Sequence, residues 1–318
     1  MNKCLYCYKE VKTGTDFHEK CAMKFFGYKK APEIPYSINE MEELAKNVVE
    51  RNISVPGVQA KLSMSLVKDT LKDSNNRLTV VGALDGNYIF KPPNNNYPEM
   101  PENEHLTMRM AEAFGIRVVP SSLIRLKTGE IAYITKRIDR TDSGEKIHML
   151  DMFQITDAFE KYKGSMEKIG KAVGEYSVNP NLDKVFFFEL ALFSFITGNN
   201  DMHLKNFSMT ESQSGWALAP AYDLLNVTLI LPEDKEETAL TLSGKKKNLD
   251  GKSFISFGKS LGLTDKQISG VFSRFFKNKA KALDWIELSF LSDALKEKYL
   301  EILEERYRRL EPVSMINI

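Results

Sequence analysis

The 318-residue chain has few cysteines and almost no net charge, and each shortage excludes a class of protein. Its three cysteines all lie within the first 21 residues, which is too few for a disulfide framework and is typical of a reducing compartment. Lys and Arg number 44 against 43 Asp and Glu, so the chain lacks the cationic surplus by which proteins bind nucleic acid through overall charge. A local basic patch is still compatible with this balance.

Long apolar runs are also absent. The most apolar run, 185–196, has 12 residues and contains a glutamate, whereas a membrane span needs about 20 apolar residues. The first 12 residues carry Lys, Glu and Tyr in place of the apolar core of a signal peptide. We therefore expect 185–196 to be a buried core helix, and the protein to be cytoplasmic with no membrane partner.

The order of predicted elements indicates an α+β fold, because a β-rich half precedes a helical half. With 42% hydrophobic residues the chain can bury a sizeable core, and its length suits one large or two ordinary domains. We predict a small head at 1–30, a β-rich domain at 31–140 and a helical domain at 141–318. Strands are predicted at 62–67, 77–81, 87–90, 118–126 and 131–138, helices at 38–50, 102–114 and 182–196, and a brief β-like interruption at 207–218.

A dense polar loop, Gly198–Ser208, directly follows the apolar helix. Asp201 and Asn206 have the D-x-x-x-x-N spacing of a kinase catalytic loop, in which the Asp accepts the proton of the attacking hydroxyl and the Asn binds a metal. Asp223 follows a predicted strand, where a second magnesium carboxylate is expected, and carboxylate and amide oxygens suffice for Mg²⁺. The alternative is an ordinary polar loop with a capping Asp.

The β-rich half is expected to bind the nucleotide phosphates. The segment from Ser54 to Lys61 has one glycine, so it is neither a Walker A loop nor a G-x-G-x-x-G loop. Lys91 directly follows the predicted strand 87–90. The kinase lysine that contacts the α- and β-phosphates lies at a similar place on a strand. The alternative is an exposed lysine at the end of a strand.

Six segments in this order resemble the HipA family of serine/threonine kinases, the toxins of bacterial toxin–antitoxin pairs. They are ISVPGVQAKL, YIFKP, PENEHLTMRMAEAFGI, TKRIDR, GNNDMHLKNFS and LAPAYDLLN. The resemblance implies a two-lobed fold similar to protein and phosphoinositide kinases, with ATP and Mg²⁺ as cofactors. It also implies a HipB-like antitoxin, contact with DNA only through that antitoxin, and a translation-linked substrate such as an aminoacyl-tRNA synthetase.

The same resemblance assigns roles to individual residues. Asp201 matches the catalytic Asp, Asn206 and Asp223 match the metal ligands, and His203 and Lys205 match polar loop residues expected to face the γ-phosphate. Ser54 matches the serine that such kinases autophosphorylate, and its phosphate is expected to repel ATP and inactivate the enzyme. The residues assigned to nucleotide binding are Ser54, Val55, Gly57, Lys61, Lys91, Lys136, Arg137, Ile138, Asn206 and Asp223, with Glu104 as the candidate partner of Lys91.

The N-terminal region departs from the full-length members of the family, which carry a further subdomain there. In this respect the chain resembles the short, split HipT-type toxins, so we expect a separate small HipS-like partner. In place of the subdomain stand Cys4, Cys7, His18 and Cys21, whose C-x₂-C-x₁₀-H-x₂-C spacing suits a closed tetrahedral zinc site. The alternative is an incidental histidine near three thiols.

Two features leave other readings open. The basic run Lys245–Lys247 is either a solvated loop or a contact to nucleotide, substrate or operator DNA. The rival functions are a small-molecule or phosphoinositide-like kinase and a catalytically silent corepressor. Intact Asp201, Asn206, Asp223 and Lys91 argue against lost catalysis.

Overall fold

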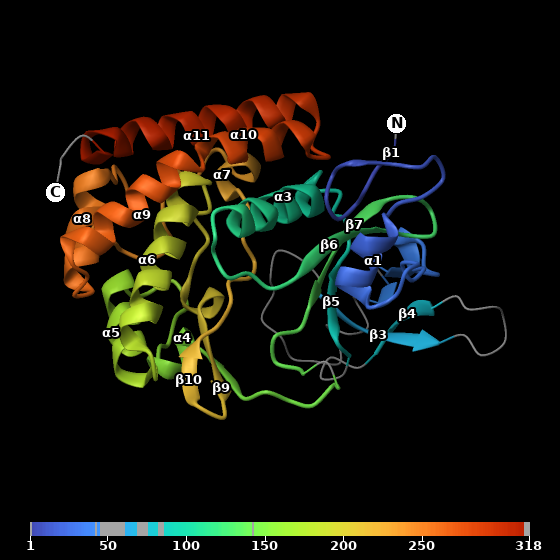
Figure 1. Ribbon diagram of the computed structural model, residues 1–318, viewed down its shortest axis with the longest axis horizontal. Helices are drawn as coiled ribbons and strands as arrows, with labels where there is room; N and C mark the ends of the chain where they lie inside the picture. Colours follow the sequence, from blue (N-terminus) through green and yellow to red (C-terminus); the bar gives the residue numbers. More distant parts are fainter. Residues whose placement is uncertain are drawn as a thin grey trace. The chain divides into compact units, whose positions relative to one another are not determined.

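The computed structural model describes residues 2–41, 43–44, 61–68, 76–81, 86–141 and 143–314, which adopt a mixed α/β fold (Figure 1). The chain divides into two compact units, which are described separately. Unit 1 comprises Met1–His105, Val119–Glu145 and Leu288–Leu291, and unit 2 comprises Leu106–Val118, Lys146–Glu287 and Ser292–Ile318. The domain boundaries at residues 30 and 140 remain predictions.

Unit 1 is built on a five-stranded antiparallel sheet with the strand order β4-β3-β5-β7-β6. Phe90 of the central strand is fully buried and lies opposite Leu62 on one side and Ile134 on the other. Tyr88 and Phe90 are buried and Ile89 between them is half-buried, which is the alternation of a strand with one covered face, and Lys91 at its end is buried as well. The strands are β3 (Leu62–Lys68), β4 (Asn76–Val80), β5 (Tyr88–Lys91), β6 (Ser121–Arg125) and β7 (Ile131–Lys136).

The N-terminal head packs directly on this sheet. It contains the short strands β1 (Asn2–Lys3) and β2 (Glu10–Val11) and the helix α1 (Glu19–Phe26) (Figure 1). Phe25 and Phe26 of α1 lie 5.9 Å and 6.3 Å from the ring of Tyr88, and the apolar side chains of head and sheet form one core. The stability of the head is therefore coupled to that of the sheet.

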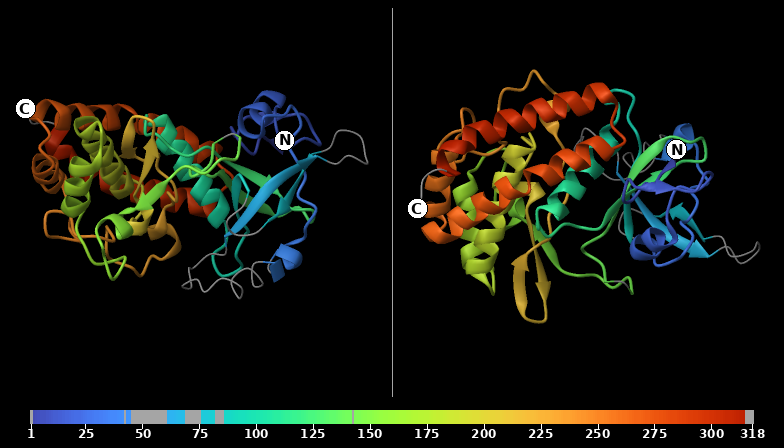
Figure 2. Two further views of the ribbon diagram at one scale, coloured as in Figure 1. Left: turned by 90° about the horizontal axis from the view of Figure 1, so that it is seen from below. Right: turned by 45° about the horizontal axis from the view of Figure 1, so that its top comes forward.

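Unit 2 is organised around α6 (Pro180–Ile196), which is buried along most of its length and packs against α5 and α11 (Figure 2). The prediction of a buried core helix here is confirmed. A three-stranded antiparallel sheet, β10-β9-β8, accompanies the helices. The described part of the chain contains no helix with the length and apolarity to cross a membrane.

The elements of unit 2 have the following bounds. The strands are β8 (Met149–Asp151), β9 (Ser208–Ser212) and β10 (Gly215–Leu218), and η1 (Leu204–Asn206) is a single 3₁₀ turn. The helices besides α6 are α4 (Met152–Ile155), α5 (Met166–Tyr176), α7 (Val227–Ile230), α8 (Gly251–Ser260), α9 (Asp265–Lys277), α10 (Lys279–Leu288) and α11 (Asp293–Ser314). Helix α3 (Met100–Ala113) begins in unit 1 and continues into unit 2.

Most predicted elements are present, with three differences. The strand predicted at 118–126 begins only at Ser121, since Pro120 has no N–H to donate to a ladder. The short strands β1, β2 and β8 were not predicted, because two or three residues are too few to show an alternation. The predicted helix at 38–50 is helical at 38–41 and 43–44, and its remainder lies outside the described residues.

Candidate active site

The polar loop of unit 2, residues 198–207, starts at a turn that only glycine accommodates. Gly198 has φ +67°, and a Cβ there would lie 2.7 Å from the amide oxygen of Asn226. Its carbonyl accepts a hydrogen bond from the N–H of Thr228 at 3.0 Å. Left-handed geometry and close approach together require glycine, and the turn directs the loop away from the axis of α6.

Asp201 and Asn206 are brought together by the single 3₁₀ turn η1. The Asn206 amide nitrogen donates to the backbone carbonyl of Asp201 at 2.9 Å, so the predicted spacing closes into a compact loop. Asn206 is buried, whereas Asp201 is partly accessible. The Tyr162 hydroxyl donates to Asp201 Oδ1 at 2.9 Å, which is the kind of contact that an acceptor hydroxyl makes with a general base.

His203 and Lys205, the loop residues predicted to face the γ-phosphate, have separate surroundings. His203 is buried, and its Nε2 lies 3.0 Å from the ammonium of Lys161. Because an ammonium can only donate, Nε2 of His203 is the acceptor in this contact. Lys205 is exposed, with its Nζ 4.8 Å from the centre of the Phe153 ring. Their assignment to the γ-phosphate remains a prediction.

Asp223 has a strained backbone conformation, and the preceding Tyr222 is hydrogen-bonded to the same loop. Its φ is +58°, a region that costs a residue other than glycine about 1–3 kcal/mol and that is frequent at functional sites. The hydroxyl of Tyr222 donates to the carbonyl of Lys205 at 2.9 Å and accepts from Ser208. Burial raises the pKa of Tyr222, so the hydroxyl keeps its proton. Asp223 therefore follows a residue hydrogen-bonded to the loop that carries Asn206.

Lys91 of unit 1 forms a buried ion pair at the end of β5. Its Nζ donates to Glu104 Oε1 at 2.6 Å, and the two side chains are 5% and 1% exposed. The ring of Tyr133 lies 5.4 Å from the same ammonium. The alternative of an exposed strand-end lysine is wrong. The partner is Glu104 rather than nearby Glu102, whose pKa burial raises to about 7.

The remaining residues assigned to the nucleotide are placed only in part. Arg137 forms a two-pronged pair with Asp139, at 2.8 Å and 2.6 Å, and its backbone N–H donates to the carbonyl of Asn87. Lys136 ends β7, Ile138 follows Arg137, and Lys61 is exposed just before β3. Ser54, Val55 and Gly57 lie outside the described residues, so the expected phosphate loop and its serine are not located.

The four N-terminal cysteine and histidine residues are brought together. The ligand atoms of Cys4, Cys7, His18 and Cys21 all lie within 4.8 Å of one another. The three cysteines are free thiols, two of them buried. The sequence therefore correctly placed a Cys/His cluster in the head.

Comparison with known proteins assigns the family. The family described as the HipA-like C-terminal domain matches residues 53–283, which is well over half of the chain. The chain belongs to the HipA-like family. The predicted resemblance is thereby confirmed.

Three proteins with similar sequences are named as kinases. A protein of Haemophilus influenzae named as a candidate kinase is 27% identical over 317 residues, covering 90% of this chain and 89% of the relative. A second candidate kinase, from Sinorhizobium fredii, is 34% identical over 209 residues, and the match covers 61% of this chain and 49% of the relative. The serine/threonine-protein kinase toxin HipA of Shewanella oneidensis is 28% identical, covering 58% of this chain and 45% of the toxin.

Two solved structures show that the fold is shared. The Shewanella oneidensis HipA in a complex with HipB and operator DNA matches with a TM-score of 0.68 at 20% identity, covering 89% of this chain and 74% of that one. The Helicobacter pylori proinflammatory kinase CtkA matches with a TM-score of 0.53 at 17% identity, covering 71% of this chain and 88% of that one. The mixed α/β fold therefore matches those of HipA and of CtkA.

The sequence did not predict three contacts of the polar loop 198–207, because the partner residues are far apart in the chain. Tyr162 lies 39 residues before Asp201, and Lys161 lies 42 residues before His203. No spacing rule connects such positions, and a lysine–tyrosine pair in a polar segment reads as ordinary surface. Tyr222 stands in the segment LAPAYDLLN, and no feature of the sequence assigned it a role.

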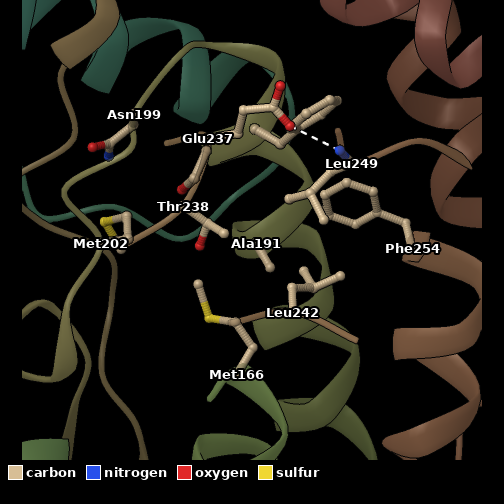
Figure 3. Close-up of a pocket in the computed structure, with 11 residues that line it drawn as sticks. Met166, Ala191, Asn199, Met202, Glu237, Thr238, Leu242, Leu249 and Phe254 are labelled. Carbon is tan, nitrogen blue, oxygen red and sulfur yellow. Dashed lines mark hydrogen bonds between the residues drawn. The ribbon is translucent and has the colours of Figure 1, made fainter. Parts of the chain in front are cut away.

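A small cavity of about 10 Å³ lies beside the loop (Figure 3). Asn199 and Met202 of the loop contribute to its wall, opposite Phe254 and Leu249. Glu237 accepts a hydrogen bond from the backbone N–H of Leu249 at 2.8 Å and is thereby engaged. A cavity of this size has room for about one water molecule, so it is a small packing defect in unit 2 rather than a nucleotide site.

Proposed function

We propose that the chain is an ATP- and Mg²⁺-dependent protein serine/threonine kinase with the two-lobed layout of HipA-like kinases. The observation that carries the proposal is the closed loop in which Asn206 donates to the carbonyl of Asp201 while a tyrosine hydroxyl already occupies Asp201 Oδ1. A carboxylate that accepts a hydroxyl beside an amide ligand has the two functions that phosphoryl transfer needs at this point.

In this proposal Asp201 orients the acceptor hydroxyl and takes its proton as the oxygen attacks the γ-phosphorus. Asn206 and Asp223 would hold Mg²⁺, since the amide and carboxylate oxygens are the hard ligands that this ion prefers. Bound Mg²⁺ would neutralise charge on the phosphates. His203 and exposed Lys205 would hydrogen-bond the γ-phosphate.

Unit 1 would contribute the groups that hold the rest of the nucleotide. The ammonium of Lys91, fixed by Glu104 in a nearly water-free site, would bind the α- and β-phosphates. The backbone of Lys136, Arg137 and Ile138 would hold the adenine. Ser54, Val55, Gly57 and Lys61 would form the phosphate loop, although the first three lie outside the described residues.

The biological role proposed is that of the toxin in a HipBA- or HipBST-like pair. The Shewanella relative is named as a kinase toxin and its structure includes HipB and operator DNA. By analogy this chain would bind a HipB-like antitoxin, contact DNA only through it, and accept a small HipS-like partner. An aminoacyl-tRNA synthetase is the proposed substrate class, and the cytoplasm the proposed location.

The decisive experiment compares Asp201→Asn with Asp284→Asn, which makes the same change at an exposed position of α10. Purified proteins are incubated with γ-labelled ATP and Mg²⁺ and a cell extract, and phosphoproteins are identified. We expect transfer to protein with the wild type and Asp284→Asn and none with Asp201→Asn, which still binds ATP. Near-normal transfer by Asp201→Asn would overturn the assignment.

The same assay separates the rival functions. Label found only in small molecules or lipids would favour a small-molecule or phosphoinositide-like kinase, and absence of any ATP turnover would favour a catalytically silent corepressor. Mass spectrometry of the wild type after incubation with ATP tests the autophosphorylation proposed at Ser54. We expect Ser54→Asp to bind ATP more weakly because a dianion near the phosphates repels them.

A further inference from the structure

The Cys/His cluster in the head has the dimensions of a tetrahedral zinc site. Zn–S bonds of about 2.3 Å and Zn–N bonds of about 2.0–2.1 Å place two tetrahedral ligands roughly 3.6–3.8 Å apart. The sulfurs of Cys7 and Cys21 lie 3.5 Å and 3.7 Å from His18 Nδ1. With Cys4 added, the four ligand atoms lie within 4.8 Å of one another. Small movements would bring all four to one ion.

The protonation of His18 also suits a metal ligand. Its Nε2 lies 2.9 Å from the carbonyl oxygen of Glu10, and because a carbonyl only accepts, Nε2 carries the proton. The lone pair of Nδ1 then faces the sulfurs of Cys7 and Cys21. A ligand histidine whose other nitrogen donates to a carbonyl is the usual arrangement around zinc, because the hydrogen bond fixes the ring.

The backbone on both sides of the cluster is already shaped for ligation. Around Cys4 and Cys7, the N–H of Cys4 donates to the carbonyl of Lys9 at 2.8 Å, and that of Tyr8 donates to Cys4 at 2.9 Å. On the other side, Cys21 follows His18 on the first turn of α1. Four ligands without an open position describe a structural site rather than a catalytic one.

The residue after Cys7 connects this cluster with the start of α3. Tyr8 is fully buried at φ +63°, and its hydroxyl lies 2.8 Å from Nδ1 of His105. The rings of Tyr8 and His105 also meet edge to face, with centres 5.3 Å apart. His105 directly follows Glu104, the partner of Lys91. The cluster is thus linked to the ion pair in three steps. Tyr8 is bonded to Cys7 in the chain, its hydroxyl contacts His105, and His105 is bonded to Glu104.

We propose that Cys4, Cys7, His18 and Cys21 bind one zinc ion, and that the ion positions Glu104 against Lys91 through Tyr8 and His105. Tyr8 and His105 are positioning residues in this proposal. The effect on nucleotide binding rests on the function proposed above, whereas the zinc site does not.

Zinc binding is tested by elemental analysis of the whole protein purified without chelators. We expect about one zinc per chain in the wild type and a large loss in His18→Ala, while His148→Ala, at an exposed histidine of unit 2, keeps its zinc. Chelator treatment of the wild type supplies the same comparison should a ligand variant fail to fold. A wild type without zinc, or with another metal in its place, would overturn the site.

The positioning role is tested with Tyr8→Phe against Tyr28→Phe. The hydroxyl of Tyr28, also in the head, makes no hydrogen bond within the described part of the chain. We expect Tyr8→Phe to keep its zinc and to weaken ATP binding about 3- to 10-fold, the range for loss of one buried hydrogen bond, and Tyr28→Phe to change neither.

ATP affinity is measured by direct binding, so that the result does not depend on turnover. Unchanged affinity in Tyr8→Phe, or loss of its zinc, would refute the positioning role. Failure of the wild type to bind ATP would instead refute the proposed function and leave the zinc result standing.

Discussion

Replacing Glu104 with glutamine would leave the ammonium of Lys91 buried without a compensating charge. The two side chains are 5% and 1% exposed and 2.6 Å apart, so water cannot replace the lost carboxylate. Breaking a buried ion pair on one side costs about 3–5 kcal/mol, and because glutamine keeps the volume and one acceptor we expect about 3 kcal/mol. The measurement is the free energy of unfolding from urea denaturation at pH 8.

Glu102 offers a matched control two residues away on the same helix. Burial raises the pKa of Glu102 from 4.5 to about 7, so the folded protein holds that proton more tightly than the unfolded chain does. This group therefore reduces stability as the pH rises from about 4.5 to about 7, at about 1.4 kcal/mol per pH unit. Glu102→Gln should remove this loss and stabilise the protein by up to ~3 kcal/mol at pH 8, with little effect near pH 4.5.

The two variants are thus expected to change stability in opposite directions. Replacing both partners, Lys91→Met with Glu104→Gln, should recover most of the loss, because no charge is then left buried. If Glu104→Gln is as stable as the wild type, the reasoning about the buried ion pair is refuted. An equal loss in Glu102→Gln would show that the start of α3 is merely intolerant of substitution.

Three further changes test the loop of unit 2. Tyr162→Phe removes a hydroxyl that competes with the acceptor at Asp201 Oδ1, so kcat/KM for protein phosphorylation should rise about 3- to 10-fold, and a fall in initial rates would contradict this. Gly198→Ala combines a left-handed φ with a clash and should cost about 2–3 kcal/mol in thermal or urea unfolding, whereas Gly262→Ala, with a similar φ but open space, should cost about 1 kcal/mol. Asp223→Ala should abolish the Mg²⁺-dependent part of ATP affinity in titration calorimetry, and an unchanged Mg²⁺ dependence would remove it from the metal site.

Features coded within a few consecutive residues were predictable from the sequence. The apolar run of α6 predicted a buried helix because its polarity pattern is uniform over several turns. The spacing of Asp201 and Asn206 predicted a kinase-like loop, and the amide of Asn206 donates to the carbonyl of Asp201 five residues earlier. The spacing of Cys4, Cys7, His18 and Cys21 predicted their cluster, since two short turns each present a pair of ligands.

Features that join distant segments were decided only by the tertiary structure. The sequence predicted Glu104 as the partner of Lys91 although Glu102 stands nearby, and only the tertiary structure shows the buried pair between Lys91 and Glu104. The head looked separate because its own apolar residues are few, yet Phe25 and Phe26 share the core of the sheet. Local spacing fixes which groups neighbour one another along a turn, whereas burial and packing between elements decide which charges and hydroxyls meet. The pairing of Tyr162 with Asp201 belongs to this second kind, and no pattern within either segment contains it.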